Sequence, residues 1–119
     1  CGFEELVAWQ KSFELSKAVY QSTQHFPTEE RFGLTSQMRR AAISVPSNIA
    51  EGWGRGSRAD YVRHLGISRG SLNELYTQAR LASELGYLTG PESLLNQLTE
   101  VGRILNGLIR SLRPNGNTT

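Results

Sequence analysis

Two stretches of the chain repeat apolar residues at alternating spacings of four and three, and this repeat constrains the fold more than any other feature. It runs from Tyr61 to Ala82 and, with further apolar positions beside it, from Leu94 to Leu112. Side chains at this spacing line one face of an α-helix, and in helical bundles that face packs against neighbouring helices. No window shows the strict alternation of a half-buried strand, so the chain is predicted to be all-α.

Apolar spacing and capping residues together predict four helices. We expect them over residues 3–24, 28–51, 57–85 and 91–113. Ser57 and Thr89 are typical caps for the third and fourth helices. Short connections favour antiparallel packing of helices that follow one another in the sequence. The prediction is an up-down antiparallel four-helix bundle that occupies residues 1–113 as a single domain, with a polar, disordered tail at residues 114–119.

Glycine and proline residues set the expected limits of the second helix. Thr28, followed by two glutamates, favours a start there, although Gly33 could interrupt the helix and leave Leu34 as its first residue. Pro46 lies inside the helix and lacks a backbone donor, which predicts a kink just before it. Three glycines within Gly52–Gly56 predict a flexible connector.

Large apolar side chains define the expected buried face of the first helix. They recur at spacings of three, four and seven, and further apolar residues widen the face. The expected core residues are Leu6, Trp9, Phe13 and Tyr20, with Val7, Leu15 and Val19 beside them.

The charged residues of the chain suggest what kind of partner it binds. The 119 residues carry thirteen Lys and Arg against eleven Asp and Glu, and eleven of the thirteen bases are arginine, which suits bidentate contacts to phosphate or carboxylate. Solvated helix faces would explain the same charges. A single cysteine, Cys1, requires no oxidising compartment, and no apolar stretch is long enough to cross a membrane or to resemble a signal peptide. We therefore expect a cytoplasmic protein.

Catalytic and metal-binding patterns are weak in this sequence. His25 and His64 are isolated on different elements, without the Glu-x-x-His spacing that metal sites in helical bundles use. Gly52–Gly56 is rich in glycine but lacks the Gly-Lys-Ser/Thr ending of a phosphate-binding loop. We expect no enzyme, no cofactor and no metal site.

A polar stripe follows the helical spacing of the second helix, and a matching one follows the third. Buried between helices, the two stripes would satisfy each other as a structural polar seam, with Glu74 as the candidate partner for Arg40. On a surface or in a pore, Arg40 and Asn48 would instead contact a ligand. The structural interpretation is favoured because both stripes are present. The seam comprises Gln37, Arg40, Ser44, Asn48, Glu51, Ser71, Glu74 and Gln78.

Arginines gather in two clusters that indicate nucleic-acid binding. The first lies near His64, Trp53 and Tyr61 in a stretch whose only acid is Asp60, and arginines beside aromatic rings can bind phosphate and stack on unpaired bases. The second has no acid after Glu100. A solvated helix face is the alternative for each cluster. The candidate contacts are Arg55, Arg58, Arg63, Arg69, Arg103, Arg110 and Arg113.

Ordered motifs along nearly the whole chain are similar to those of a known family. They are Phe3–Lys11, Phe26-Pro27, Gly33–Ala41, Ser44–Gly52 and Gly70–Leu75. They resemble the four-helix bundle proteins encoded in intervening sequences of bacterial large-subunit (23S) ribosomal RNA. The resemblance implies a ring-like homopentamer without known catalytic activity.

A second resemblance concerns the last helix. Glu100–Leu105 is similar to the accessory variability determinant of diversity-generating retroelements, a basic pentamer of the same fold that binds a reverse transcriptase and nucleic acid. The leading hypothesis is a non-enzymatic, homo-oligomeric scaffold or accessory subunit associated with RNA. The alternative is a protein-interaction module that is accessory to a reverse transcriptase.

Overall fold

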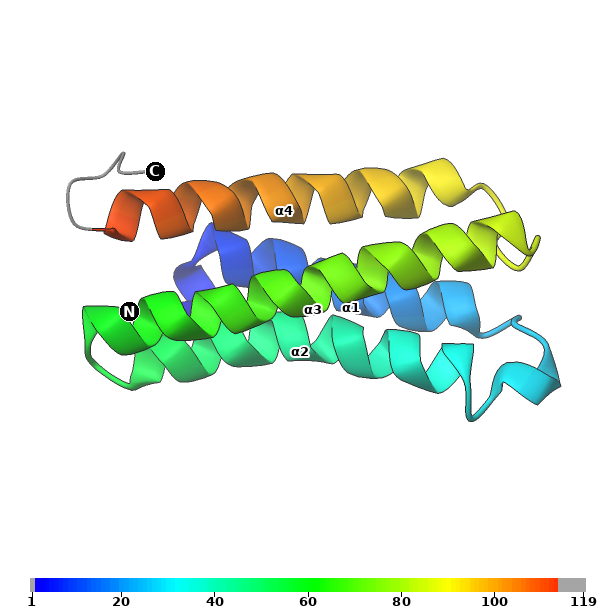
Figure 1. Ribbon diagram of the computed structural model, residues 1–119, viewed down its shortest axis with the longest axis horizontal. Helices are drawn as coiled ribbons and strands as arrows, with labels where there is room; N and C mark the ends of the chain where they lie inside the picture. The colour runs from blue at the N-terminus through cyan, green and yellow to red at the C-terminus, as the bar shows by residue number, and fades with distance from the viewer. Residues whose placement is uncertain (1, 114–119) are drawn as a thin grey trace.

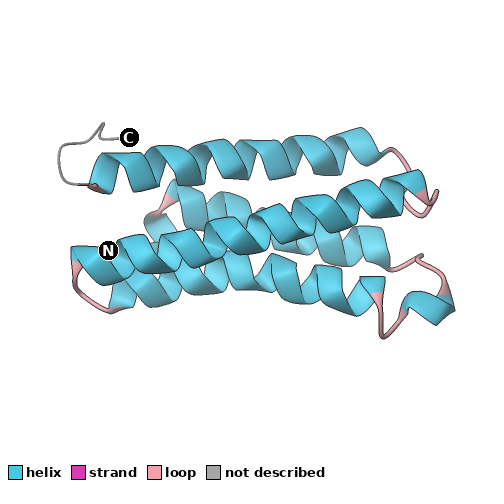
Figure 2. Ribbon diagram, in the orientation of Figure 1, coloured by secondary structure: helices cyan, strands magenta, loops and turns pink. Residues whose placement is uncertain are grey.

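The computed structural model describes residues 2–113, which form a bundle of four α-helices (Figure 1). The helices are α1 (Val7–Thr23), α2 (Leu34–Gly54), α3 (Arg58–Glu84) and α4 (Pro91–Leu112), with short 3-10 turns η1 (Phe3–Glu5) and η2 (Thr28–Glu30). α1 and α3 run in one direction and α2 and α4 in the other, and the described residues contain no strand (Figure 2). The predicted all-α, up-down four-helix bundle is confirmed. The expectations for Cys1 and for residues 114–119 lie outside the described residues.

The seven-residue repeats form the core. Every member of the α3 repeat is buried, and Leu65, Leu75, Ala79 and Ala82 are completely so. On α4 the members of the repeat from Leu94 to Leu105 are buried. Beyond Leu105, the repeat members Leu108 and Leu112 are only partly buried, and Ile109 is buried instead. On α2 the buried residues include Met38, Ala41, Val45 and Ile49, as the spacing predicts.

The buried face of α1 differs from the prediction. Phe13 and Tyr20 are 44% and 39% exposed, whereas Ser12, Ser16 and Thr23 are buried. The hydroxyl of Ser16 donates a hydrogen bond to the carbonyl oxygen of Ala42 at 2.9 Å. That carbonyl would bond to the N–H of the residue four positions on, which is Pro46 and has none. A small hydroxyl side chain facing α2 therefore replaces the bond that Pro46 removes, and α2 continues as one helix to Gly54.

The second helix begins at Leu34, so the prediction of a continuous helix from Thr28 is wrong. Residues 28–30 form the 3-10 turn η2, and Gly33 has the non-helical torsions φ −108° and ψ −111°. The N–H of Leu34 donates to Oε1 of Glu30 at 3.2 Å, so a carboxylate satisfies one of the free donors at the start of α2.

The predicted connector at Gly52–Gly56 is also wrong in extent. α2 continues to Gly54, and Gly52 is buried against α3. The two helices are so close here that a Cβ at Gly52 would lie 2.6 Å from Cβ of His64. Gly52 is needed for close helix packing. Only Gly56, with φ +87°, requires the conformational freedom of glycine, and the actual connection is residues 55–57.

The remaining helix ends test the predicted caps. Ser57 Oγ accepts the N–H of Asp60 at 3.1 Å, which confirms the cap of α3. The cap predicted at Thr89 is wrong, because Gly90, with φ +61°, occupies the capping position and has no side chain to offer. Pro91 begins α4 as expected. None of the described helices is both long and apolar enough to cross a membrane.

Candidate nucleic-acid interface

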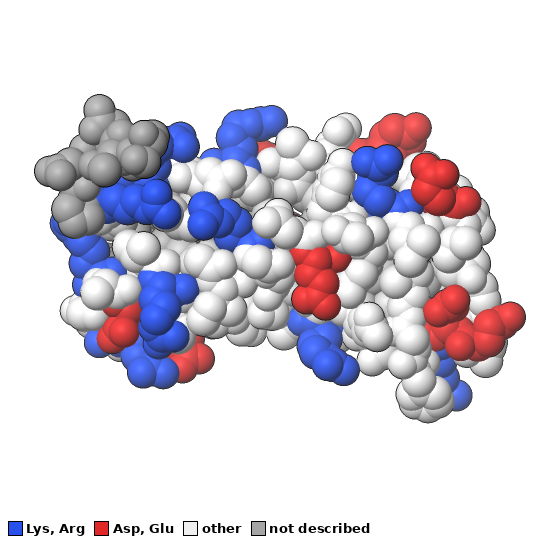
Figure 3. All heavy atoms as spheres, in the orientation of Figure 1, with Lys and Arg blue, Asp and Glu red and all other residues white. Residues whose placement is uncertain are grey.

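The two ends of the bundle differ in charge. Lys and Arg side chains gather over the end where α3 begins and α4 ends, whereas Asp and Glu are prominent at the opposite end (Figure 3). The antiparallel fold produces this separation, because it brings the second half of α4 beside the first half of α3. We call the following seven residues the basic end: Arg55, Arg58, Arg63, Arg69, Arg103, Arg110 and Arg113.

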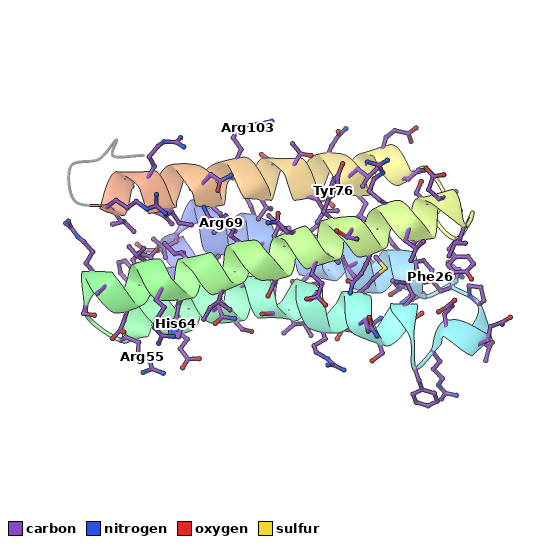
Figure 4. All side chains as sticks on the ribbon, in the orientation of Figure 1. Phe26, Arg55, His64, Arg69, Tyr76 and Arg103 are labelled. Atoms are coloured by element: carbon purple, nitrogen blue, oxygen red, sulfur yellow. The ribbon has the colours of Figure 1, made fainter. Side chains whose placement is uncertain are left out.

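The seven arginines extend from this end toward the middle of the bundle, where Arg69 and Arg103 lie, and they do not share one face (Figure 4). Arg69 on α3 donates a hydrogen bond to Oδ1 of Asn106 on α4 at 3.2 Å, so the first cluster contacts the helix that carries the second. Arg103 projects from the outer side of α4, while Arg55 lies on the α2 side of the bundle (Figure 4).

Two of the arginines have acidic partners within the chain. Arg55 pairs with Glu51 at 2.8 Å and Arg63 approaches Asp60 at 3.9 Å. The hydrogen bond from Arg55, and then its charge, lowers the pKa of Glu51, and the same bond raises the pKa of Arg55. These exposed pairs contribute little to stability. They do reduce the positive charge that these two arginines present to a partner.

The other arginines of the basic end are less compensated. Arg58, Arg103, Arg110 and Arg113 are exposed and form no ion pair with any residue in the range 2–113. Because nothing in the described chain neutralises them, these four side chains are the best candidates for contacts to phosphate.

Trp53 and Tyr61, the two aromatic residues near the first cluster, differ in exposure. Tyr61 is 8% exposed, so it cannot stack on a base, and burial raises the pKa of its hydroxyl. Trp53 is 41% exposed and meets the Tyr61 ring at 5.7 Å and 77°. Of the two predicted stacking residues, only Trp53 is available to a ligand.

His64 belongs to the core at this end. It is 5% exposed, its Cβ faces Gly52 of α2, and its Nε2 lies 3.4 Å from Nη2 of Arg63. Its Nδ1 has no hydrogen-bond partner among the described residues. No group of three His, Cys, Asp or Glu residues within the range 2–113 could hold a metal ion.

A groove between α2 and α3, with a volume of about 410 Å³, is lined by five of the eight residues of the polar seam: Gln37, Arg40, Ser44, Ser71 and Glu74. At its floor the hydroxyls of Ser44 and Ser71 share a hydrogen bond of 2.8 Å, and the amide of Asn48 donates to the Ser44 carbonyl at 2.9 Å. At its rim Arg40 and Glu74 are exposed, and they form no ion pair with each other.

Not all of the remaining members of the seam lie at this groove. Gln37 is exposed on its wall, and Gln78 is buried with its amide 3.3 Å from Oε2 of Glu74. Glu51 points to Arg55 instead of to α3. The structure thus brings the serines and Asn48 together, whereas the buried pair of Arg40 with Glu74 does not form because both side chains can remain in water.

Sequence reasoning missed an apolar hollow between α1 and α2. Its volume is about 310 Å³, and Trp9 stacks on Phe13 at 4.9 Å on its α1 side. The signal was the aromatic spacing on α1, which was assigned to the core. The hollow is lined by Phe3, Trp9, Phe13, Ser16, Ile43, Pro46, Ser47 and Ala50.

Comparison with known proteins identifies a matching family and a similar crystal structure. The family model described as 23S rRNA-intervening sequence protein matches residues 4–107. A crystal structure of a protein of unknown function from the S23 ribosomal protein family of Bacteroides thetaiotaomicron is similar with a TM-score of 0.80 and 28% sequence identity. The similarity covers 87% of this chain and 96% of that one. No curated protein matches the sequence.

Proposed function

Because the chain belongs to the family of 23S rRNA-intervening sequence proteins, we propose that it is a non-enzymatic, homo-oligomeric bundle that associates with RNA as a scaffold or accessory subunit. The observation that carries the RNA association is the basic end, where four arginines have no ion pair within residues 2–113. Arginine clusters bind the phosphate backbone through charge and bidentate hydrogen bonds, without base specificity. We also propose a cytoplasmic location.

Salt-dependent RNA affinity tests this proposal. The measurement is a fluorescence-anisotropy titration of a labelled single-stranded RNA at several salt concentrations. Each phosphate contact to a single strand contributes about 0.7 to the slope of log affinity against log salt. The variant Arg58→Gln, Arg103→Gln, Arg110→Gln should therefore bind more weakly, with a slope smaller by about 2.

A matched control removes three cations outside the basic end. Lys17→Gln, Arg31→Gln, Arg80→Gln changes the net charge by the same amount, and these residues lie on α1, beyond η2 and near the end of α3. It should retain most of the affinity and the slope of the parent protein. Equal losses in the two variants would show that RNA responds only to total charge and would contradict the proposed interface.

The homo-oligomer, with a ring-like pentamer as the expected form, is supported by the apolar hollow. Phe13 and Ile43 are each 44% exposed beside it, and apolar surface of this kind gains stability when a second molecule covers it. Light scattering after size exclusion should give five times the chain mass of 13.2 kDa. Phe13→Ser should dissociate the assembly, whereas Phe32→Ser, which removes an exposed phenylalanine elsewhere, should not. A monomeric parent protein would refute this part of the proposal.

A further inference from the structure

We infer that Trp53 is a stacking platform for an unpaired base, so that the RNA held at the basic end is single-stranded. This inference rests on the proposed function and specifies which form of RNA is bound. Trp53 occupies the last turn of α2, directly before the connection to α3 that contains Arg55. Indole rings next to arginines are a recurring arrangement in proteins that bind single strands, because stacking and phosphate contacts act on the same nucleotide.

The position of the indole ring is supported from within the bundle. Tyr61 is 8% exposed and meets Trp53 at 77°, so a buried ring on α3 helps to fix the orientation of the indole. A perpendicular contact leaves at least one indole face free of Tyr61, and 41% of the residue is exposed. A preorganised, open aromatic face loses little conformational entropy when a base stacks on it.

The surroundings of Trp53 leave room for a nucleotide. A Cβ added at Gly54 or Gly56 would meet no atom within 4 Å, so the two glycines that follow Trp53 in the sequence border open space. Arg58 follows in the first turn of α3 without an ion pair in residues 2–113 and can hold a phosphate nearby. Trp53 and Arg58, on either side of one short connection, would then contact the base and the phosphate of the same nucleotide.

The other exposed aromatic rings lie outside the connection between α2 and α3, and each has a neighbour within the chain. Arginines lie over the rings of Phe32, Tyr20 and Tyr76 at 5.5, 4.6 and 5.9 Å, respectively. Phe13 is stacked on Trp9 with an interplanar angle of 23°. Among the large hydrophobic residues that are exposed, Trp53 is therefore the aromatic ring that combines an open face with the basic end.

Duplex RNA would not use this platform. The faces of paired bases are covered by their neighbours in the helix, and an indole can stack only on a base that is unstacked. Phosphate contacts alone would hold a duplex through the arginines. The inference therefore predicts tighter binding of a single strand than of a duplex with the same length.

Tryptophan fluorescence tests the inference directly, because the chain has only two tryptophans, Trp9 and Trp53. In the variant Trp9→Phe, Trp53 is the sole reporter. Titration with single-stranded oligouridine RNA should quench its emission, and a blunt duplex of equal length should quench it much less. This readout needs no change at Trp53 itself.

The RNA affinity of variants at Trp53 is the second measurement. Trp53→Leu should weaken binding of oligouridine about 5- to 100-fold without changing the salt slope, since a stacked base but no phosphate contact is lost. Trp53→Phe should recover part of the affinity. Unchanged affinity in Trp53→Leu, or an unquenched Trp53 when RNA is bound, would overturn the inference and leave the proposed function intact. A parent protein without salt-dependent RNA affinity would overturn both.

Discussion

The two ends of the bundle use polar side chains in opposite ways. At the end formed by Phe26–Leu34 and Leu85–Pro91, which we call the closed end, one carboxylate joins two connections. Oε2 of Glu30 accepts the hydroxyl of Tyr87 at 3.1 Å, while its Oε1 accepts the N–H that begins α2. The Phe26 ring packs beside Tyr87 at 5.4 Å.

At the basic end, most polar side chains have no such internal use. Arg58, Arg103 and Arg110 are exposed without ion pairs in residues 2–113, and Trp53 keeps an open face. Packing at this end depends on Gly52 and His64. The bundle therefore uses polar side chains for internal contacts at the closed end, whereas at the basic end it leaves polar side chains exposed to a partner. Substitutions at the two ends should therefore affect different measurements.

The largest expected effect on stability is at the closed end. Phe26 is 8% exposed, and Phe26→Ala should leave a cavity and lower the free energy of unfolding by about 3 to 5 kcal/mol. RNA affinity should be unchanged at temperatures where the variant is folded. Urea unfolding measures the first quantity and anisotropy the second. A loss below about 1 kcal/mol would mean that the closed end does not hold the helices as described.

A second substitution probes packing at the basic end. Gly52→Ala places a methyl group 2.6 Å from Cβ of His64 and should lower the free energy of unfolding by about 1 to 3 kcal/mol through overpacking. Gly54→Ala is the control, because its Cβ would meet nothing within 4 Å. If the two variants unfold at the same urea concentration, α2 and α3 do not approach closely at Gly52.

Alkaline pH should produce a smaller effect, which involves one tyrosine at each end of the bundle. The hydrogen bond to Glu30, and then burial, raises the pKa of Tyr87, while burial raises the pKa of Tyr61. Because the folded protein favours the neutral hydroxyls, the unfolded chain ionises first. Stability should be complete below about pH 10 and should fall as the pH rises further.

Two variants separate the tyrosines in this titration. Tyr87→Phe should flatten the alkaline decline and lower stability at neutral pH, because Glu30 loses a donor. Tyr61→Phe should also flatten it but should not destabilise the protein at neutral pH, since the Tyr61 hydroxyl has no partner among the described residues. Parallel urea unfolding curves for all three proteins above pH 10 would contradict this assignment.

The smallest effect on stability is expected from the arginines of the basic end. The variant Arg58→Gln, Arg103→Gln, Arg110→Gln should change the free energy of unfolding by less than about 0.5 kcal/mol, because exposed side chains without ion pairs contribute little. Circular dichroism during urea unfolding measures the change. A large loss of stability would show that these arginines are structural, and their effect on RNA binding would then need another explanation.

Local periodicity was sufficient for predicting the bundle and most of its core. The repeat from Tyr61 to Ala82 is buried as expected. It could be predicted because the residues that share one face of an α-helix are determined by their spacing in that helix alone. The cap at Ser57 was equally predictable, since both partners are three residues apart. Local rules of this kind do not need knowledge of neighbouring elements.

Predictions that depended on contacts between helices were less successful. Ser16 is buried because its hydroxyl completes the backbone hydrogen bonding of a different helix at Ala42, and position 52 requires glycine because His64 lies against it. Glu30 and Tyr87 are 57 positions apart, so no local pattern connects them. The arginine clusters were visible in the sequence, whereas their convergence at one end follows from the antiparallel order of α3 and α4 (Figure 1).

The central claim, that RNA contacts the basic end and not the closed end, is tested most directly by photocrosslinking. The full chain would be irradiated with single-stranded RNA, and the crosslinked peptides would be mapped by mass spectrometry. We expect crosslinks within residues 53–69 and 103–113. Crosslinks concentrated in residues 26–34 and 85–91, or spread evenly over the chain, would contradict it.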